Sequence, residues 1–359
     1  MNAIYNKVFF TILLFCVSGF SFVSAQPLSG SYTINGAVAT GGTNYQTFSD
    51  AVSDLEANGI SDNVVFNVAS GTYNEQITIT KIAGTSTSDT IIFQSASGDS
   101  TDVVLTFSAS SSDNYTVELD SAEYITFQKM TLAATNTSFG HVVQFTNHVV
   151  GINLLNNYIV GTDATTSTNQ ALIFSNNNVS GQAVKILNNY LDEGSHGLYL
   201  DMNNSGNFTG MQISSNNIFN SFSRGMYIQD ADFLTVSDNR ITSDDEYTGF
   251  EGIHLFDCDS SLMVLGNYVY GVKNRALLVQ HSTNSSANRG LIANNFLHSR
   301  DNGDGVFMTS NDYLDIFHNS IHKSNNTNVN NYALQMSHGD FNRIWNNIFA
   351  NSGGGPAVY

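Results

Sequence analysis

The chain has 359 residues, of which 12% are charged, and its 30 acidic residues against 12 basic ones give a formal net charge of −18. A surface this acidic repels nucleic acid and anionic membranes, and it repels anionic polysaccharides unless a divalent cation bridges the two. The composition therefore predicts no nucleic-acid partner.

Residues 1–25 have the features of a cleaved secretory signal. Lys7 precedes an apolar run over residues 8–17, and a small-x-small sequence ends at residue 25. About ten apolar residues are too few to span a membrane. We therefore expect an exported protein, secreted or at the cell surface, with no membrane insertion after cleavage. Removing the signal leaves Cys258 as the only cysteine, so no intramolecular disulfide is expected.

Residues 26–63 are predicted to form a polar leading segment and one helix. Apolar residues recur there with helical spacing, at Phe48, Ala51, Val52 and Leu55. Thr47 with Asp50 is typical of a capping box, and Gly59 is typical of a helix stop. Because the end of a stack of strands exposes apolar core and unpaired backbone, we expect this helix to cap the strands that follow.

A repeat runs through most of residues 64–359. Its unit is apolar, polar, apolar, two polar residues, Asn, any residue, apolar, as in L-T-V-S-D-N-R-I at residues 234–241. Such short alternating stretches predict strands, not helices. An earlier copy has Met130 in place of the Asn, and the Asn itself recurs at intervals of 23 to 32 residues, at Asn157, Asn189, Asn216, Asn239, Asn267, Asn295, Asn319 and Asn347.

The repeat predicts a β-solenoid. One unit cannot close a core, but units stacked about 4.8 Å apart pair strand with strand in parallel and bury a continuous interior. The recurring Asn is expected at a tight bend, because Asn tolerates the left-handed conformation. Stacked Asn amides are expected to hydrogen-bond to one another along the solenoid axis.

These units resemble the right-handed parallel β-helix repeats of the pectate-lyase-like superfamily over roughly residues 64–359. The resemblance implies an all-β, right-handed single-stranded parallel β-helix of the bacterial secreted type. It does not fix an activity, because this fold carries lyases, hydrolases, esterases and non-catalytic surface proteins. The stretch G-T-Y-N-E-Q-I-T-I at residues 71–79 resembles the opening of pectin methylesterases, but their catalytic motifs have no match here, so esterase activity is not expected.

The sequence P-A-V-Y at residues 356–359 reads as the start of another turn. We therefore expect either a section of a larger exported protein or a monomer that closes its stack at residue 359.

A second strand follows most Asn bends, and its alternation sends one column of side chains outward. This column contains Tyr199, Tyr227, His254, Leu278, Phe307 and Gln335. Aromatic faces at one strand spacing suit stacking on sugar rings. Tyr199, Tyr227, His254 and Phe307 are therefore predicted to bind polysaccharide. The alternative is that another loop or domain covers them.

Charged residues precede these strands in a second column, in which Arg224, Glu251 and Arg275 predict a surface salt-bridge ladder worth about 0–1 kcal/mol per pair. The full column is His196, Arg224, Glu251, Arg275 and Asp304.

Asp230, Asp257 and His281 stand at the far ends of the same strands. Asp257 beside His281 would suit a base held by a carboxylate, and Asp230 with Asp257 would suit Ca²⁺ or an acid–base pair. Solvated strand ends are the simpler interpretation. The acidic residues 244–246 offer a second, weaker calcium hypothesis, and no other cofactor is expected.

A lyase would need a basic side chain close to such carboxylates, and Lys273 and Arg275 are the candidates that the sequence offers near Asp257. Asp230 and His281 complete the predicted catalytic set. Three hypotheses follow: a secreted polysaccharide-binding module, a polysaccharide lyase or glycoside hydrolase acting through this set, and a non-catalytic structural or adhesin-like surface module.

Overall fold

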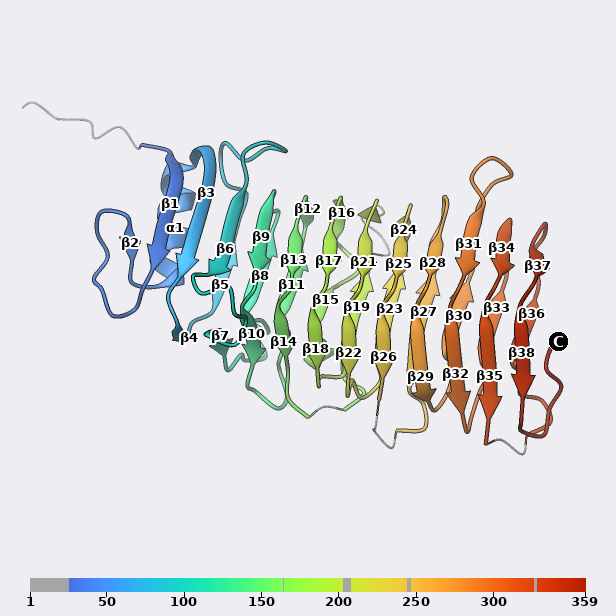
Figure 1. Ribbon diagram of the computed structural model, residues 1–359. Coiled ribbons are helices and arrows are strands. Elements are labelled where there is room, and N and C mark those ends of the chain that lie inside the picture. The colour runs from blue at the N-terminus through green and yellow to red at the C-terminus, as the bar shows by residue number, and fades with distance from the viewer. Residues whose placement is uncertain (1–25, 164, 203–207, 244–246, 326–327) are drawn as a thin grey trace, which may run out of the picture.

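The computed structural model describes residues 26–163, 165–202, 208–243, 247–325 and 328–359. The predicted signal at residues 1–25 and the acidic residues 244–246 lie outside the described residues. The described strands stack into a parallel β-solenoid of about 11 turns with one short α-helix near the N-terminus (Figure 1). The prediction of an all-β, right-handed parallel β-helix is confirmed. Across the described residues, no helix is both long and apolar enough to cross a membrane.

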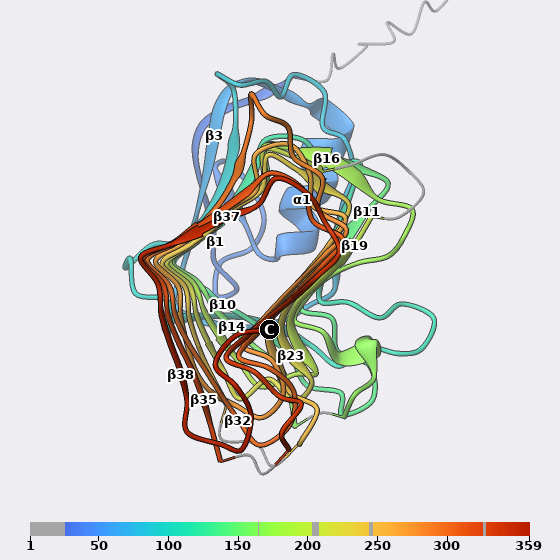
Figure 2. The same cartoon turned by 90° about the vertical axis from the view of Figure 1, so that its right-hand side faces the viewer.

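Three long parallel sheets run the length of the solenoid, and each turn contributes one strand to each sheet in most of the described chain. Figure 2 looks along the axis and shows successive turns superposed on one another. We call the three long sheets A, B and C, and a fourth, short sheet D.

Sheet A consists of β2 (Asn44–Tyr45), β1 (Leu28–Ile34), β3 (Ile60–Val68), β6 (Ile91–Ser95), β9 (Ile125–Gln128), β13 (Asn153–Leu155), β17 (Lys185–Leu187), β21 (Gln212–Ser214), β25 (Thr235–Ser237), β28 (Met263–Leu265), β31 (Gly290–Ala293), β34 (Leu314–Phe317) and β37 (Arg343–Trp345). Sheet B consists of β4 (Gly71–Asn74), β7 (Val103–Phe107), β10 (Thr131–Ala134), β14 (Tyr158–Val160), β18 (Tyr190–Asp192), β22 (Asn217–Phe219), β26 (Arg240–Thr242), β29 (Tyr268–Val272), β32 (Phe296–Arg300), β35 (Ser320–Ser324) and β38 (Ile348–Asn351).

Sheet C consists of β5 (Ile77–Ile79), β8 (Val117–Asp120), β11 (Val143–Thr146), β15 (Ile173–Ser175), β19 (His196–Asp201), β23 (Arg224–Gln229), β27 (Glu251–Phe256), β30 (Leu277–Gln280), β33 (Val306–Thr309) and β36 (Leu334–Ser337). Sheet D is short and consists of β12 (His148–Val150), β16 (Ser180–Gln182), β20 (Phe208–Thr209) and β24 (Ala231–Asp232). A single 3₁₀ turn among the described residues, η1 (Thr168–Gln170), lies between β14 and β15.

The interior is filled by side chains that repeat in register. Phe66, Phe93 and Phe127 come from β3, β6 and β9, and their rings stack with centroids 4.8 and 5.0 Å apart. That separation matches the spacing of neighbouring strands. Alternation of apolar and polar residues therefore places equivalent rings on top of one another, and Cys258 is buried in the same core.

The recurring Asn forms a buried hydrogen-bond ladder between sheets A and B. The Asn239 Nδ2 donates to Asn267 Oδ1 at 3.0 Å and to the Ile213 carbonyl at 2.8 Å. Its Oδ1 accepts from the backbone N–H and the Nδ2 of Asn216, at 3.0 and 2.9 Å. The same pattern links the ladder from Asn157 through to residue 347. Each interior amide of the ladder therefore hydrogen-bonds to the turn before it and to the turn after it.

The prediction that the ladder Asn itself takes the left-handed conformation is wrong. The residue before it does so, with φ of 57° at Asn188, 58° at Ser215, 55° at Asp238 and 64° at Gly266. The side chain of the ladder Asn points inward to reach the next turn. The chain therefore bends at the residue before it. The residue at the bend is exposed enough to vary in type from turn to turn.

The helix α1 (Phe48–Asn58) buries the predicted apolar stripe against the first turn, where Phe48 contacts the ring of Tyr73 at a centroid distance of 5.2 Å. Thr47 Oγ1 accepts from the Asp50 N–H at 3.0 Å, and Gly59 ends the helix with φ of 68°. The Glu75 carboxylate accepts the first two helical N–H groups, at 3.1 and 2.9 Å, which satisfies donors that every helix start leaves unpaired.

Two elements were missed by the sequence analysis. The leading segment contains β1, which pairs in parallel with β3 and adds a strand to sheet A. Its sequence, L-S-G-S-Y-T-I, has too few apolar residues to stand out from a polar segment. Sheet D was also missed, because its strands have only two or three residues each.

Candidate functional site

The outer face of sheet C carries the predicted column of side chains in register. Tyr199 pairs with Tyr227, Tyr227 with His254, His254 with Leu278, and Leu278 with Phe307. Each residue lies on a successive turn, from β19 to β33. Their neighbours along the strands, such as Leu198 and Leu200, are fully buried. The alternation that the sequence predicts is therefore present.

Phe174 on β15 extends the column by one turn and was missed. Its ring lies 5.8 Å from the Tyr199 ring, with an angle of 13° between the planes, and its other side meets the His141 ring at 3.8 Å. The run A-L-I-F at residues 171–174 is continuously apolar and does not alternate, so the sequence carries no clear signal that the Phe174 side chain lies on the outer face.

The aromatic rings of Phe174, Tyr199 and Tyr227 stack on one another, so their faces are not turned toward solvent. Tyr199 has Phe174 on one side and Tyr227 on the other, the latter with centroids 4.9 Å apart and planes at 21°. Tyr227 meets the edge of His254 at 5.0 Å. The predicted stacking of sugar rings on the faces of Tyr199 and Tyr227 is therefore not available. A ligand on this surface would meet ring edges and hydroxyl groups.

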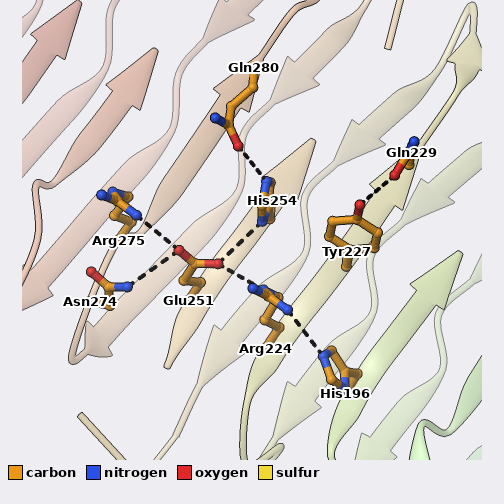
Figure 3. Close-up of polar contacts among 9 residues, drawn as sticks. All are labelled: His196, Arg224, Tyr227, Gln229, Glu251, His254, Asn274, Arg275 and Gln280. Carbon is orange, nitrogen blue, oxygen red and sulfur yellow. Dashed lines mark hydrogen bonds and ion pairs between the residues drawn. The ribbon is translucent and has the colours of Figure 1, made fainter. Parts of the chain in front are cut away.

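Glu251 is the centre of a charged network beside the column (Figure 3). Arg224 Nε donates to its carboxylate at 2.8 Å, and Arg275 Nη1 does so at 3.3 Å. His254 Nδ1 lies 3.3 Å from the same carboxylate, and Asn274 Nδ2 donates to it at 3.4 Å. The predicted salt-bridge ladder is present, but the Glu251 side chain is only 6% exposed. It is a buried hub and not a surface pair, because the charged groups of two turns close over it.

Burial and neighbouring charges determine which groups of this network are ionised. Burial alone would raise the pKa of Glu251, but the hydrogen bond and charge of His254 and the charge of Arg224 outweigh it and lower the pKa to about 2. Burial and the nearby Arg224 charge lower the pKa of His196 to about 3, so its ring is neutral at physiological pH. Burial is the main cause that raises the pKa of Tyr199 and Tyr227.

Hydrogen-bonding groups continue across the face. The Tyr227 hydroxyl donates to Gln229 Oε1 at 2.5 Å, and His254 Nε2 lies 2.9 Å from Gln280 Oε1 (Figure 3). The Arg224 guanidinium lies 5.6 Å from the centre of the Tyr227 ring and keeps 31% of its side chain exposed. Rings, amides and a cation therefore share one surface.

Asp230, Asp257 and His281 lie in register just past the ends of β23, β27 and β30, all in the left-handed conformation with φ of 56°, 48° and 59°. The His281 ring stacks on Phe256 at 5.1 Å. Burial raises the pKa of Asp257, which the positive charge of His281 opposes, and burial followed by the charge of Asp257 raises the pKa of Asp230.

The predicted catalytic set does not come together. Arg275 contacts Glu251 at the start of the sheet C strands, whereas Asp257 follows their far end, six residues along the strand. At about 3.3 Å per residue these groups are about 20 Å apart. Lys273 is largely buried just after β29, at the same starting side as Arg275. The placement of Lys273 and Arg275 beside Asp257 was therefore wrong, because sequence proximity ignored the length of β27.

The calcium hypothesis at Asp230 and Asp257 stays a prediction. In the part of the chain that the structure describes, no group of three or more His, Cys, Asp or Glu side chains is arranged to hold a metal ion. Two carboxylates on neighbouring turns supply at most part of the six to eight oxygen ligands that Ca²⁺ prefers.

No protein-family model matches the sequence, and no curated protein matches it. Solved structures do share the fold. The GH136 lacto-N-biosidase from Eubacterium ramulus matches with a TM-score of 0.51 and 11% identity over 91% of this chain and 68% of that chain. The surface adhesin PfbA of Streptococcus pneumoniae (TM-score 0.45, 12% identity, 86% of each chain) and pectate lyase Pel9A (TM-score 0.44, 13% identity, 90% and 79%) are more distant.

The likeness to the lacto-N-biosidase shows a shared fold, and it agrees with the parallel β-helix that the predicted resemblance implied. At 11% identity it establishes the fold and not an activity.

Proposed function

We propose that the protein binds extracellular polysaccharide along the outer face of sheet C. The observation that carries this proposal is the register of the face: the rings of Phe174, Tyr199, Tyr227 and His254 lie on successive turns, and Arg224, Gln229 and Gln280 lie on the same strands or the next. A polymer has repeating units, so a surface with repeating units can contact several of them at once. The prediction of export, which no described residue tests, places such a surface outside the cell.

The ring stack sets the mode of recognition. Because Tyr199 and Tyr227 present edges and hydroxyl groups, and because ring edges carry partial positive charge, they suit the oxygen atoms of sugar hydroxyls. Gln280 and Arg224 add an amide and a cation that hydrogen-bond to hydroxyl groups. Self-stacking also holds the rings in place before a ligand arrives, which reduces the entropy cost of binding.

The charges of the face favour binding over cleavage. A general acid or base works best with a pKa near the working pH. Glu251 is held as an ion by its partners, His196 is held neutral, and the tyrosine hydroxyls are held protonated. The remaining catalytic candidates, Asp230, Asp257 and His281, lie at the far ends of the strands, about 20 Å from the start of the strands where Glu251 lies. We therefore propose a binding module and not a lyase or hydrolase.

The test is a panel of neutral and acidic glycans, with Ca²⁺ and with a chelator, scored for both retention and product release. We expect retention without product release. Tyr227→Ala and Tyr199→Ala should weaken retention at least tenfold, which is about 1.4 kcal/mol. Tyr190→Ala is the matched control, because Tyr190 is an exposed tyrosine on sheet B.

Release of oligosaccharide products by the wild-type protein would overturn the binding-only proposal. If that release also stopped in Asp257→Ala, the far ends of the strands would be the catalytic site. Equal retention by the wild type and both tyrosine variants would move the glycan site off sheet C.

A further inference from the structure

A pocket of about 250 Å³ opens on sheet B, away from the outer face of sheet C. It extends across four neighbouring strands of sheet B, one from each of four successive turns: β22, β26, β29 and β32. It is lined by Phe219, Arg240, Thr242, Ser243, Tyr270, Gly271 and Arg300.

A β-bulge shapes this pocket. The pairing of β29 with β32 slips between Val269 and Val272, so that β29 has one residue more than its partner there. Bulges re-aim side chains and are common beside functional sites. Here Gly271 takes φ of 74°, and the space where its Cβ would stand has no heavy atom within 4 Å. The neighbouring Tyr270 is turned outward and is 47% exposed.

The two arginines of the pocket are not neutralised by the described protein. In the residues that the structure describes, neither Arg240 nor Arg300 forms an ion pair with a carboxylate. The Arg300 Nε is buried without a hydrogen-bond partner. The Arg240 guanidinium lies 4.6 Å from the centre of the Tyr268 ring, a contact that fixes its position and leaves its N–H groups available.

Positive charge gathers on this part of a strongly acidic chain. His298 contacts Tyr270 at 4.8 Å and stacks on His322 at 4.9 Å. Burial, and after it the positive charges of His322, Lys323 and Arg300, lower the pKa of His298 to about 4, so the His298 ring is neutral at physiological pH. The net charge of −18 acts over longer distances, where salt screens it beyond about 8 Å at physiological ionic strength.

We propose that this pocket binds an oxyanion, a carboxylate or a sulfate group, carried on a sugar ring. Arg240 and Arg300 donate to the oxyanion from two sides, and charge-assisted hydrogen bonds of this kind are about twice as strong as neutral ones. The exposed ring of Tyr270 offers an apolar surface to the sugar that carries the group. This site does not depend on the binding proposed for sheet C, because it uses different residues on a different sheet.

The test is calorimetric titration of the whole protein with four probes: sodium sulfate, a uronate oligosaccharide, a sulfated oligosaccharide and a neutral oligosaccharide of equal length. We expect saturable binding of at least one acidic oligosaccharide, weakened by added NaCl, and no binding of the neutral one at this site. Arg240→Gln and Arg300→Gln should each weaken the acidic ligand at least tenfold. The two acidic arms tell a carboxylate from a sulfate.

Three controls keep the result interpretable. Lys185→Gln removes one exposed positive charge from sheet A and should bind as the wild type does. Arg300→Lys keeps the charge and should retain more affinity than Arg300→Gln. Thermal unfolding of each variant shows that it is folded. Affinity unchanged in both glutamine variants, binding of sulfate but of neither acidic oligosaccharide, or no saturable binding of any anion would overturn the proposal.

Discussion

The corner between sheets A and B and the outer face of sheet C are both built from side chains that repeat in register, but they differ in one respect. At the corner one residue type recurs, and Asn189, Asn216, Asn239 and Asn267 are 1–2% exposed with their amides fully bonded to neighbouring turns. On the face the residue type varies along the column from Tyr199 to Gln335, and Tyr199, Tyr227, Phe307 and Gln335 are partly exposed whereas His254 and Leu278 are buried. A residue type that recurs at every turn indicates a structural role. A position whose residue type varies from turn to turn indicates a surface that is free to take a binding role.

The largest effect is expected from breaking the corner. Asn239→Leu removes four hydrogen bonds and leaves the backbone N–H of Asn216 and one N–H of its side-chain amide buried without an acceptor, whereas Asn267 Oδ1 keeps the Asn239 backbone N–H as a donor at 3.0 Å. Each unpaired group costs about 1–3 kcal/mol, so unfolding by urea should show a loss of about 4 kcal/mol. The exposed Asn302→Ala should change stability by less than about 0.5 kcal/mol. A loss below about 1 kcal/mol for Asn239→Leu would show that the ladder is not structural.

The next effect concerns the charged hub beside the face. The pKa of Glu251 is lowered to about 2 in the folded protein. A depressed carboxyl pKa stabilises the fold above the unfolded value of about 4.3, and that contribution is lost as the pH falls toward 2. Glu251→Gln should therefore lower stability by on the order of 3 kcal/mol at pH 7, and the difference from the wild type should shrink between pH 4.3 and 2. Parallel stability curves over that range would contradict the assignment.

A smaller effect separates the two residues of each bend. Asp238 has φ of 55°, so Asp238→Val should cost about 1–2 kcal/mol, because β-branched residues avoid the left-handed region. Asp238→Gly should be close to neutral. If both variants unfolded at the same denaturant concentration, the bend would not depend on a left-handed residue at this position.

The fold was predictable because period and alternation are properties of the sequence. They gave the register from Tyr199 to Gln335 and the position of the Asn ladder. Side-chain direction was not predictable: the rings of Tyr199 and Tyr227 turn toward each other, which no alternation pattern encodes.

The failures at the candidate site have physical causes too. Arg275 and Asp257 are close in sequence but lie at opposite ends of neighbouring strands. The burial of Glu251 depends on Arg224 and Arg275 from adjacent turns, which a sequence pattern shows as exposed charges. The pocket beside Tyr270 depends on a bulge, and a single Gly in a strand signals a bulge only weakly.

The central claim is that sheet C contacts the polysaccharide through ring edges and hydroxyl groups. Its most direct measurement is an NMR titration of the protein, labelled on its tyrosine rings, with the glycan that the panel retains. The account predicts that the ring signals of Tyr199 and Tyr227 shift in a saturable way while that of Tyr32, on sheet A, stays in place. Saturable binding that leaves the Tyr199 and Tyr227 signals unmoved would contradict it.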